Sequence, residues 1–260
     1  MSQLVSKTIS NKKLNNRIKL NNKYQKFNFI NWQEKNYKEI LAKFNISKKN
    51  ISILDLGCGT GIQVDFFNRH FFKPKIIATD LSRDSLSQAK KKNKSNKIKF
   101  ILSNMDNFFK KKNKLKFDII HSSYAFYYSK NPMNLLKKCY TNLNVNGCII
   151  IACPMQKHEM VEFVEKHGHV NQKVLKTLKL YESVFKPFLK LKIKLIRKII
   201  FKKVNKISFK NTRDFLNFWQ NTTYYDNKYR HKIAEKLDSR VSLQFKKGTQ
   251  IIALKKLSKK

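Results

Sequence analysis

Three alternating glycines in the segment 53–63 (ILDLGCGTGIQ) constrain the fold of this chain more than any other feature. They follow a short apolar run, 51–56, which is typical of a buried strand. After them, apolar residues over 62–72 recur with a helical period. Glycine permits a sharp strand-to-helix turn and lets the backbone come close to a ligand. We therefore expect an α/β unit with a cofactor at this turn.

The rest of the chain continues the same rhythm of strand and helix. Apolar runs typical of strands recur at 75–79, 97–102, 117–121 and 148–153. Helical patterns lie between them, one of them capped by Ser82. At the end of the chain, apolar stretches on both sides of Lys247-Gly248, within 241–254, predict an antiparallel hairpin. Together these runs predict an α/β fold with a doubly wound, mostly parallel seven-stranded sheet and a C-terminal antiparallel hairpin.

The spacing of the glycines excludes two common loops. A Walker loop ends in Gly-Lys-Ser or Gly-Lys-Thr, whereas Gly61 is followed by Ile62. A dinucleotide fingerprint needs glycine where Ile62 stands. What remains is Gly57-x-Gly59-x-Gly61, with Asp80 at the end of the second strand. In an open α/β sheet this is where a carboxylate binds ribose hydroxyls.

These residues resemble the cofactor-binding motif of class I S-adenosylmethionine-dependent methyltransferases. Within that family the chain is most similar to the broad small-molecule group that contains ubiquinone-biosynthesis-like enzymes. Three further stretches match: Asp80-Leu81-Ser82, Asn104-Met105-Asp106 and 143–147 (LNVNG). The family usually reads Leu-x-Pro-Gly-Gly in the last stretch, but Asn146-Gly147 still predicts a turn. The resemblance covers about 51–154, and it implies a Rossmann-like fold with S-adenosyl-L-methionine as cofactor.

The resemblance also implies a role for each matching residue. Asp55 orients the ammonium group of the cofactor, the first two glycines of the loop border its methionine part, and Asp80 bridges the ribose hydroxyls. Asp106 accepts a hydrogen bond from the adenine amino group and Met105 lines the ring, although a local turn is the alternative for Asp106. The expected cofactor-binding residues are Asp55, Gly57, Gly59, Gly61, Asp80, Leu81, Met105, Asp106, His121 and Ser122.

The acceptor side is expected where the fourth strand runs into 121–128 (HSSYAFYY). Methyl transfer from a sulfonium depends on positioning, and a base is needed only if the acceptor loses a proton. His121 and Tyr124 are the candidate catalytic residues. The alternative for His121 is a histidine satisfied by the protein, and for Tyr124 it is core packing. No metal site is expected, because nothing near His167-x-His169 completes a ligand set.

The net charge is +41, with 57 Lys and Arg against 16 Asp and Glu. The basic residues are spread along the whole chain, and few are arginines, the preferred readers of phosphates and bases. This distribution favours a solvated lysine surface over a nucleic-acid-binding face. The preferred function is methyl transfer to an oxygen or nitrogen of a small-molecule or saccharide-type acceptor. The alternatives are an RNA methyltransferase and a non-catalytic cofactor-binding or membrane-associated protein.

Four segments are expected: a flexible basic arm over 1–22 with a helix near Leu14 to Leu20, a cofactor-binding core over 23–154, a mostly helical substrate-selecting cap over 155–240, and a closing hairpin with a basic tail over 241–260. Within the cap, the stretch 187–206 (PFLKLKIKLIRKIIFKKVNK) is interpreted as an amphipathic lid helix, with a membrane-surface helix as the alternative.

The sequence shows no signal peptide and no membrane-spanning stretch. We therefore expect a cytoplasmic protein with no more than weak electrostatic membrane contact. The identity of the acceptor and the oligomeric state stay open.

Overall fold

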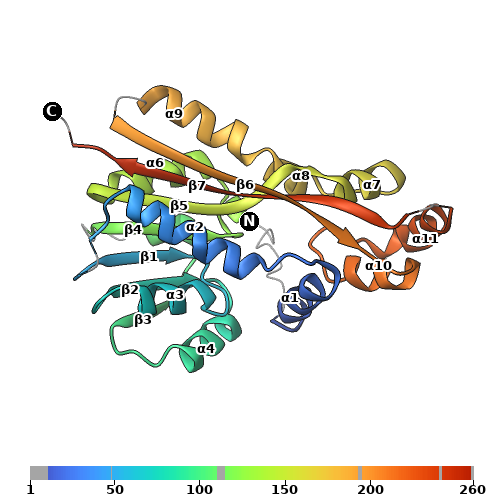
Figure 1. The fold of residues 1–260 in the computed structure, drawn as a ribbon, viewed down its shortest axis with the longest axis horizontal. Coiled ribbons are helices and arrows are strands. Elements are labelled where there is room, and N and C mark those ends of the chain that lie inside the picture. The colour runs from blue at the N-terminus through green and yellow to red at the C-terminus, as the bar shows by residue number, and fades with distance from the viewer. Residues whose placement is uncertain (1–10, 48, 110–114, 193–194, 240–241, 259–260) are drawn as a thin grey trace, which may run out of the picture. The chain divides into compact units, whose positions relative to one another are not determined.

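The computed structural model describes residues 11–258, apart from 48, 110–114, 193–194 and 240–241 (Figure 1). The chain forms two compact units. The core unit comprises residues 31–153, 180–201 and 251–260. The second unit comprises residues 1–30, 154–179 and 202–250, and the long C-terminal strands run through both.

The sheet has seven strands in the order β3-β2-β1-β4-β5-β7-β6. Strand β1 pairs in parallel with β2 and β4, β2 with β3, and β4 with β5. Their bounds are β1 (Ser52–Leu56), β2 (Lys75–Asp80), β3 (Ile98–Leu102), β4 (Phe117–Ser123), β5 (Leu143–His158), β6 (Ile196–Ser208) and β7 (Gln244–Lys256). The predicted fold class, a mostly parallel doubly wound sheet with antiparallel C-terminal strands, is confirmed.

Helices cover both faces of the sheet in the core unit. Their bounds are α2 (Phe29–Lys43), α3 (Ile62–His70), α4 (Arg83–Lys92), α5 (Met105–Phe108), α6 (Pro132–Thr141) and α9 (Lys186–Lys192), with a 3₁₀ turn at Phe126–Tyr128 and a π turn at Tyr181–Phe185. The predicted cap of α4 is present, because the Ser82 hydroxyl accepts a hydrogen bond from the Ser85 N–H at 3.2 Å. Helix α6 begins with a proline, which has no N–H to leave unpaired.

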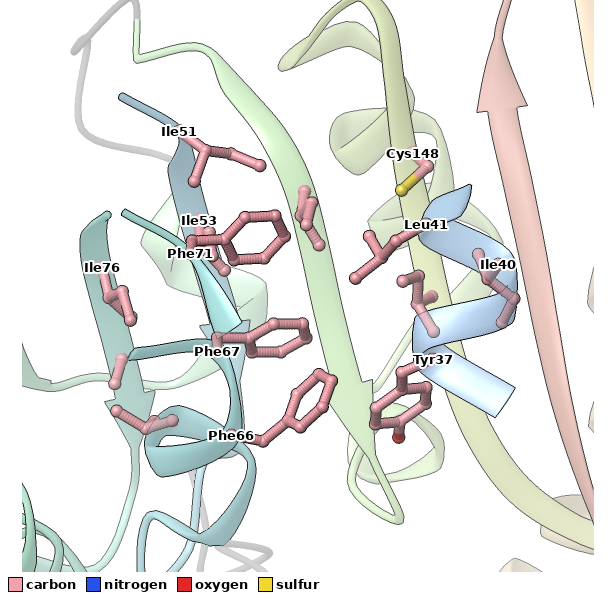
Figure 2. Close-up of a cluster of buried hydrophobic side chains, with 14 of the residues drawn as sticks. Tyr37, Ile40, Leu41, Ile51, Ile53, Phe66, Phe67, Phe71, Ile76 and Cys148 are labelled. Atoms are coloured by element: carbon pink, nitrogen blue, oxygen red, sulfur yellow. The ribbon is translucent and has the colours of Figure 1, made fainter. Parts of the chain in front are cut away.

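Each face of the sheet has its own hydrophobic cluster. Successive strand residues point to opposite faces, so Ile53 lies in the cluster under α2 and α3, and Leu54 lies in the cluster under α6 and α9. Figure 2 shows the first cluster, where aromatic rings of α3 meet Tyr37 of α2. The ring centroids of Tyr37 and Phe66 are 5.8 Å apart. This packing brings the N-terminal half of α2 to the strands that carry the predicted site.

The second unit contains α1 (Asn11–Tyr24), α7 (Glu159–His167), α8 (Gln172–Leu178), α10 (Thr212–Trp219), a 3₁₀ turn at Asn227–Tyr229 and α11 (Arg230–Asp238). Its core is aromatic, with Phe215 and Trp219 of α10 fully buried. Helix α1 includes the helix expected near Leu14 to Leu20, and residues 1–10 of the predicted basic arm lie outside the described residues.

The expectation of one amphipathic helix over 187–206 is wrong. Helix α9 ends at Lys192, and residues from Ile196 onward form strand β6 beside β7. The stretch is rich in isoleucine, which favours strands, and pairing with β7 satisfies the backbone groups on one side of it. The segment expected to be a mostly helical cap therefore contains a 13-residue strand.

The expected hairpin within 241–254 is also wrong, because Gln244–Lys256 is one uninterrupted strand whose neighbours are β5 and β6. Gly248 serves close packing instead of a turn: a Cβ atom there would lie 2.7 Å from the Cβ of Met155. The turn expected at Asn146-Gly147 is an irregularity inside β5, where Asn146 has a φ of 63° and the pairing with β4 shifts register.

Candidate active site

The predicted site residues lie in the core unit, at and just beyond the carboxyl ends of β1, β2, β3 and β4. The ends of parallel strands meet at one edge of a sheet, and this edge is where open α/β folds bind ligands. The structure brings the loop after β1 against the turn after β4, because a Cβ atom on Gly57 would lie 2.3 Å from the Cβ of Ala125 and 3.6 Å from the Cε of Met105.

All three glycines of the loop have left-handed backbone, with φ of 74° at Gly57, 53° at Gly59 and 81° at Gly61. The amide groups of Gly57 and Cys58 both donate to the carbonyl oxygen of Thr79, at 2.8 and 2.9 Å. These two bonds fix the loop to the carboxyl end of β2. The loop is therefore a preformed element with its backbone close to neighbouring side chains.

Asp80 ends β2 and holds the loop from the other side. Its Oδ2 accepts from the Gly59 N–H at 2.9 Å, and its Oδ1 accepts from the Ser82 N–H at 2.9 Å. Burial raises the pKa of the Asp80 carboxyl, and the backbone N–H donors act in the opposite direction. Each carboxylate oxygen keeps a second lone pair, so the side chain can still accept from ligand hydroxyls. The next residue, Leu81, is exposed.

A buried carboxylate stands at the end of β1. Asp55 is 1% exposed, and its Oδ1 lies 2.8 Å from the Nδ1 of His121 on β4, which is 0% exposed. The other ring nitrogen of His121, Nε2, lies 3.0 Å from the hydroxyl of Tyr37 on α2. The second carboxylate oxygen of Asp55, Oδ2, is buried and has no hydrogen-bond partner among the described residues.

The contact with Tyr37 extends into a polar chain along α2. The Gln33 Nε2 donates to the Tyr37 hydroxyl at 3.0 Å and to the Ser123 hydroxyl at 2.9 Å, and the Gln33 Oε1 accepts from the Gln63 Nε2 at 3.2 Å. We did not predict this chain from the sequence. A usable signal existed, since Gln33 and Tyr37 are four residues apart and share a helical face with buried Ile40.

Asp106 is already engaged by the protein. The Ser129 hydroxyl donates to its Oδ1, and the Lys130 N–H donates to its Oδ2 at 2.9 Å. It thus fixes α5 to the residues after the 3₁₀ turn. A polar cavity of about 220 Å³ beside it is also lined by Asn104, Asn107 and Lys130. The role of Asp106 toward adenine stays a prediction.

Two more predicted residues lie at the end of β4. Ser122 is buried, and its hydroxyl donates to the carbonyl oxygen of Leu56 at 2.8 Å. Tyr124 has a φ of 53°, and its N–H donates to the carbonyl oxygen of Ala152 at 2.8 Å. Left-handed backbone is strained for a bulky residue, and such strain is concentrated at functional sites.

No cluster of three or more His, Cys, Asp or Glu side chains suited to a metal ion occurs in the part of the chain that the structure describes. The four cysteines are buried free thiols, and burial raises the pKa of Cys58, which lies inside the glycine loop. Across the same described ranges, no helix has both the length and the apolar character of a membrane span.

The comparisons with known proteins agree with this geometry. Residues 47–233 match the family described as a methyltransferase domain. A malonyl-[acyl-carrier protein] O-methyltransferase 1 of Ilyobacter polytropus is 34% identical over 104 residues, which are 40% of this chain and 38% of that protein. The chain thus matches about two fifths of the length of this curated relative.

Solved structures show the same fold. The plantazolicin methyltransferase BpumL, in complex with a pentazolic desmethylPZN analog and SAH, has a TM-score of 0.58 at 16% identity, covering 96% of this chain and 92% of its own. The YcgJ protein of Bacillus subtilis has a TM-score of 0.54 at 12% identity, covering 86% of this chain and 100% of its own.

The chain therefore belongs to the methyltransferase domain family, and it has the class I fold of S-adenosylmethionine-dependent methyltransferases. The family prediction made from the glycine loop is confirmed. S-adenosyl-L-methionine is the cofactor of this class. The residues present fit that cofactor, because the buried Asp55 carboxylate beside the loop has one oxygen left for a cationic group.

Proposed function

We propose that this chain transfers the methyl group of S-adenosylmethionine to an oxygen or nitrogen of a small-molecule or saccharide-type acceptor. The observation that carries the proposal is the Oδ2 of Asp55, which is buried at the end of β1 next to the glycine loop and has no hydrogen-bond partner among the described residues. A buried carboxylate oxygen without a hydrogen-bond partner is costly, and an ammonium group bound there would offset that cost.

Three parts of the site would hold the cofactor. Asp55 would take the ammonium group, the backbone of the glycine loop would lie along the methionine part, and Asp80 would accept from the ribose hydroxyls. Met105 and Asp106 lie on α5, the short helix after β3, where the adenine is expected. When bound, the cofactor supplies an activated methyl group on a sulfonium, so the protein's task is to position the acceptor and exclude water.

The hydrogen bonds of His121 argue against its use as a general base. Both ring nitrogens are occupied by Asp55 and Tyr37, and the side chain is fully buried. A base must reach the proton that it removes, directly or through a water. We therefore favour the alternative in which His121 is satisfied by the protein. Tyr124, which follows β4 with its strained backbone, is the candidate for contact with the acceptor.

The acceptor class rests on the relatives. The name of the Ilyobacter polytropus protein describes O-methylation of a malonyl group on an acyl-carrier protein, and the plantazolicin methyltransferase was crystallised with a pentazolic desmethylPZN analog and SAH. The malonyl group that the first name describes is not part of a nucleic acid. The name of the first protein supports an oxygen acceptor for this chain, free or attached to a carrier.

The test uses the purified full chain. Calorimetry should show binding of S-adenosylhomocysteine and negligible binding of nicotinamide dinucleotides. Release of S-adenosylhomocysteine from the methylated cofactor should rise when pools of small acids, amines or sugars are added. Cofactor binding with no turnover on any acceptor pool would support the non-catalytic alternative, and no binding at all would refute the proposed function.

A second candidate, RNA methylation, is favoured only by the net charge of +41. Binding to RNA would then weaken steeply with salt, by roughly one unit of log–log slope for each phosphate neutralised. Methyl incorporation into RNA that exceeds incorporation into small-molecule pools at physiological salt would favour this candidate over the small-molecule acceptor.

A further inference from the structure

We infer that His121, Tyr37 and Gln33 form a positioning chain that holds Asp55 for the ammonium group of the cofactor. The inference rests on the proposed function and names residues of α2 that no motif of the glycine loop includes. It starts from the Asp55 carboxylate, of which one oxygen is bound by the protein and the other is left for a ligand.

The direction of each hydrogen bond follows from the donors available. The Gln33 Nε2 can only donate, and it contacts both the Tyr37 hydroxyl and the Ser123 hydroxyl. The Tyr37 oxygen therefore accepts from Gln33, and its own proton is directed to the Nε2 of His121. Burial and the nearby Asp55 charge raise the pKa of Tyr37, so the phenol keeps that proton.

The hydrogen bonds of this positioning chain determine which ring nitrogen of His121 carries the proton. With its Nε2 accepting from Tyr37, a neutral His121 carries its proton on Nδ1 and donates it to the Oδ1 of Asp55. The negative charge of Asp55 is then not cancelled by a charged imidazole. The carboxylate is held in one orientation but keeps its charge for an ammonium group at Oδ2.

Packing holds the chain in place. The rings of Phe67 and His121 meet edge to face with centroids 5.1 Å apart, and Tyr37 and His121 do so at 5.2 Å. Figure 2 shows Tyr37 beside Phe66 and Phe67 of α3, and the ring centroid of Tyr37 lies 5.8 Å from that of Phe66 and 6.2 Å from that of Phe67. Helix α2 therefore contributes to the cofactor site through hydrogen bonds, although it lies before the glycine loop in the sequence.

The experiment compares two ligands by calorimetry on the full chain. S-adenosylhomocysteine carries the ammonium group, and 5′-methylthioadenosine has the same nucleoside and sulfur without the amino acid part. Tyr37→Phe should weaken S-adenosylhomocysteine binding about tenfold and leave 5′-methylthioadenosine binding unchanged, since only the ammonium contact depends on the positioning chain. Tyr24→Phe is the matched control, because it removes the hydroxyl of another buried tyrosine, which is bonded to Asp214 at 2.8 Å in the second unit.

Conservative variants at His121 give a second readout. The amide nitrogen of Asn falls near the position of Nδ1, and that of Gln falls near Nε2. His121→Asn should thus keep S-adenosylhomocysteine affinity within about threefold, while His121→Gln should lose about tenfold. In turnover assays the loss should appear as a raised KM for the methylated cofactor with kcat little changed, as expected for an interaction equal in ground and transition states.

The outcomes separate this inference from the proposed function. If the unmodified chain binds neither ligand, the proposed function fails. If it binds both, but Tyr37→Phe weakens both equally or weakens neither, the positioning chain is wrong. Equal losses in His121→Asn and His121→Gln would also overturn it, because a merely structural histidine does not distinguish the two nitrogen positions.

Discussion

Replacing Gly57 with alanine tests the geometry of the glycine loop. The residue has a φ of 74°, and left-handed backbone costs an L-residue about 1–2 kcal/mol. The new Cβ would also lie 2.3 Å from the Cβ of Ala125, far inside van der Waals contact, and overpacking of this kind costs about 1–3 kcal/mol. The two effects together predict a loss of about 2–5 kcal/mol in the free energy of unfolding, measured by urea denaturation.

A second substitution separates the two effects. Gly57→Ala combined with Ala125→Gly removes the clash but keeps the strained φ, so it should recover about 1–3 kcal/mol relative to Gly57→Ala alone. Ala125→Gly by itself measures the combined cost of losing this methyl group and of adding the backbone freedom of glycine. A Gly57→Ala variant within about 0.5 kcal/mol of the unmodified chain, the range of ordinary surface changes, would refute the described loop.

Further predictions concern the ribose contact, the stability at acid pH and the basic surface. Asp80→Ala should weaken S-adenosylhomocysteine binding by about 1–3 kcal/mol in calorimetry, because it removes the acceptor of the ribose hydroxyls. The control Asp84→Ala, at an exposed position, should leave the affinity unchanged. Unchanged affinity in Asp80→Ala would show that Asp80 does not bind the cofactor. Burial lowers the pKa of His158 to about 3, so the unfolded chain binds its proton first as the pH falls. The free energy of unfolding should therefore decrease below about pH 6.5, by up to about 1.4 kcal/mol per pH unit from this group. In His158→Gln the decrease should be less steep. Equal slopes of unfolding free energy against pH in the variant and the unmodified chain would contradict the burial of a neutral histidine. Binding to anionic vesicles should be weak, abolished by salt and absent with neutral vesicles, and co-sedimentation that persists in high salt would indicate insertion instead.

The residues at the strand ends were predictable because their signals are local. The glycine loop, Asp80 and the Ser82 cap each depend on a few neighbouring residues, and the structure places them where the strand and helix periods indicate. Strand β6 was not predictable in the same way. Its apolar and basic residues fit a helical arc about as well as a strand, and pairing with a strand near the end of the chain decides between them.

The polar chain on α2 depends on tertiary packing. Tyr37 and His121 are 84 residues apart in the sequence, and only the packing of α2 against the sheet brings the phenol to the imidazole. The same holds for Asp106, since both of its oxygens are engaged by residues that lie more than twenty positions later. Sequence patterns showed which residues end the strands, but they did not show which of those residues already had partners.

The most direct test of the central claim is a crystal structure of the chain with S-adenosylhomocysteine. We expect the ammonium nitrogen at about 2.7–2.9 Å from the Oδ2 of Asp55, as for a charge-assisted hydrogen bond, with His121 still bonded to the Oδ1. Ligand bound elsewhere, or an ammonium group turned away from a carboxylate whose Oδ2 stays unpartnered, would contradict the account.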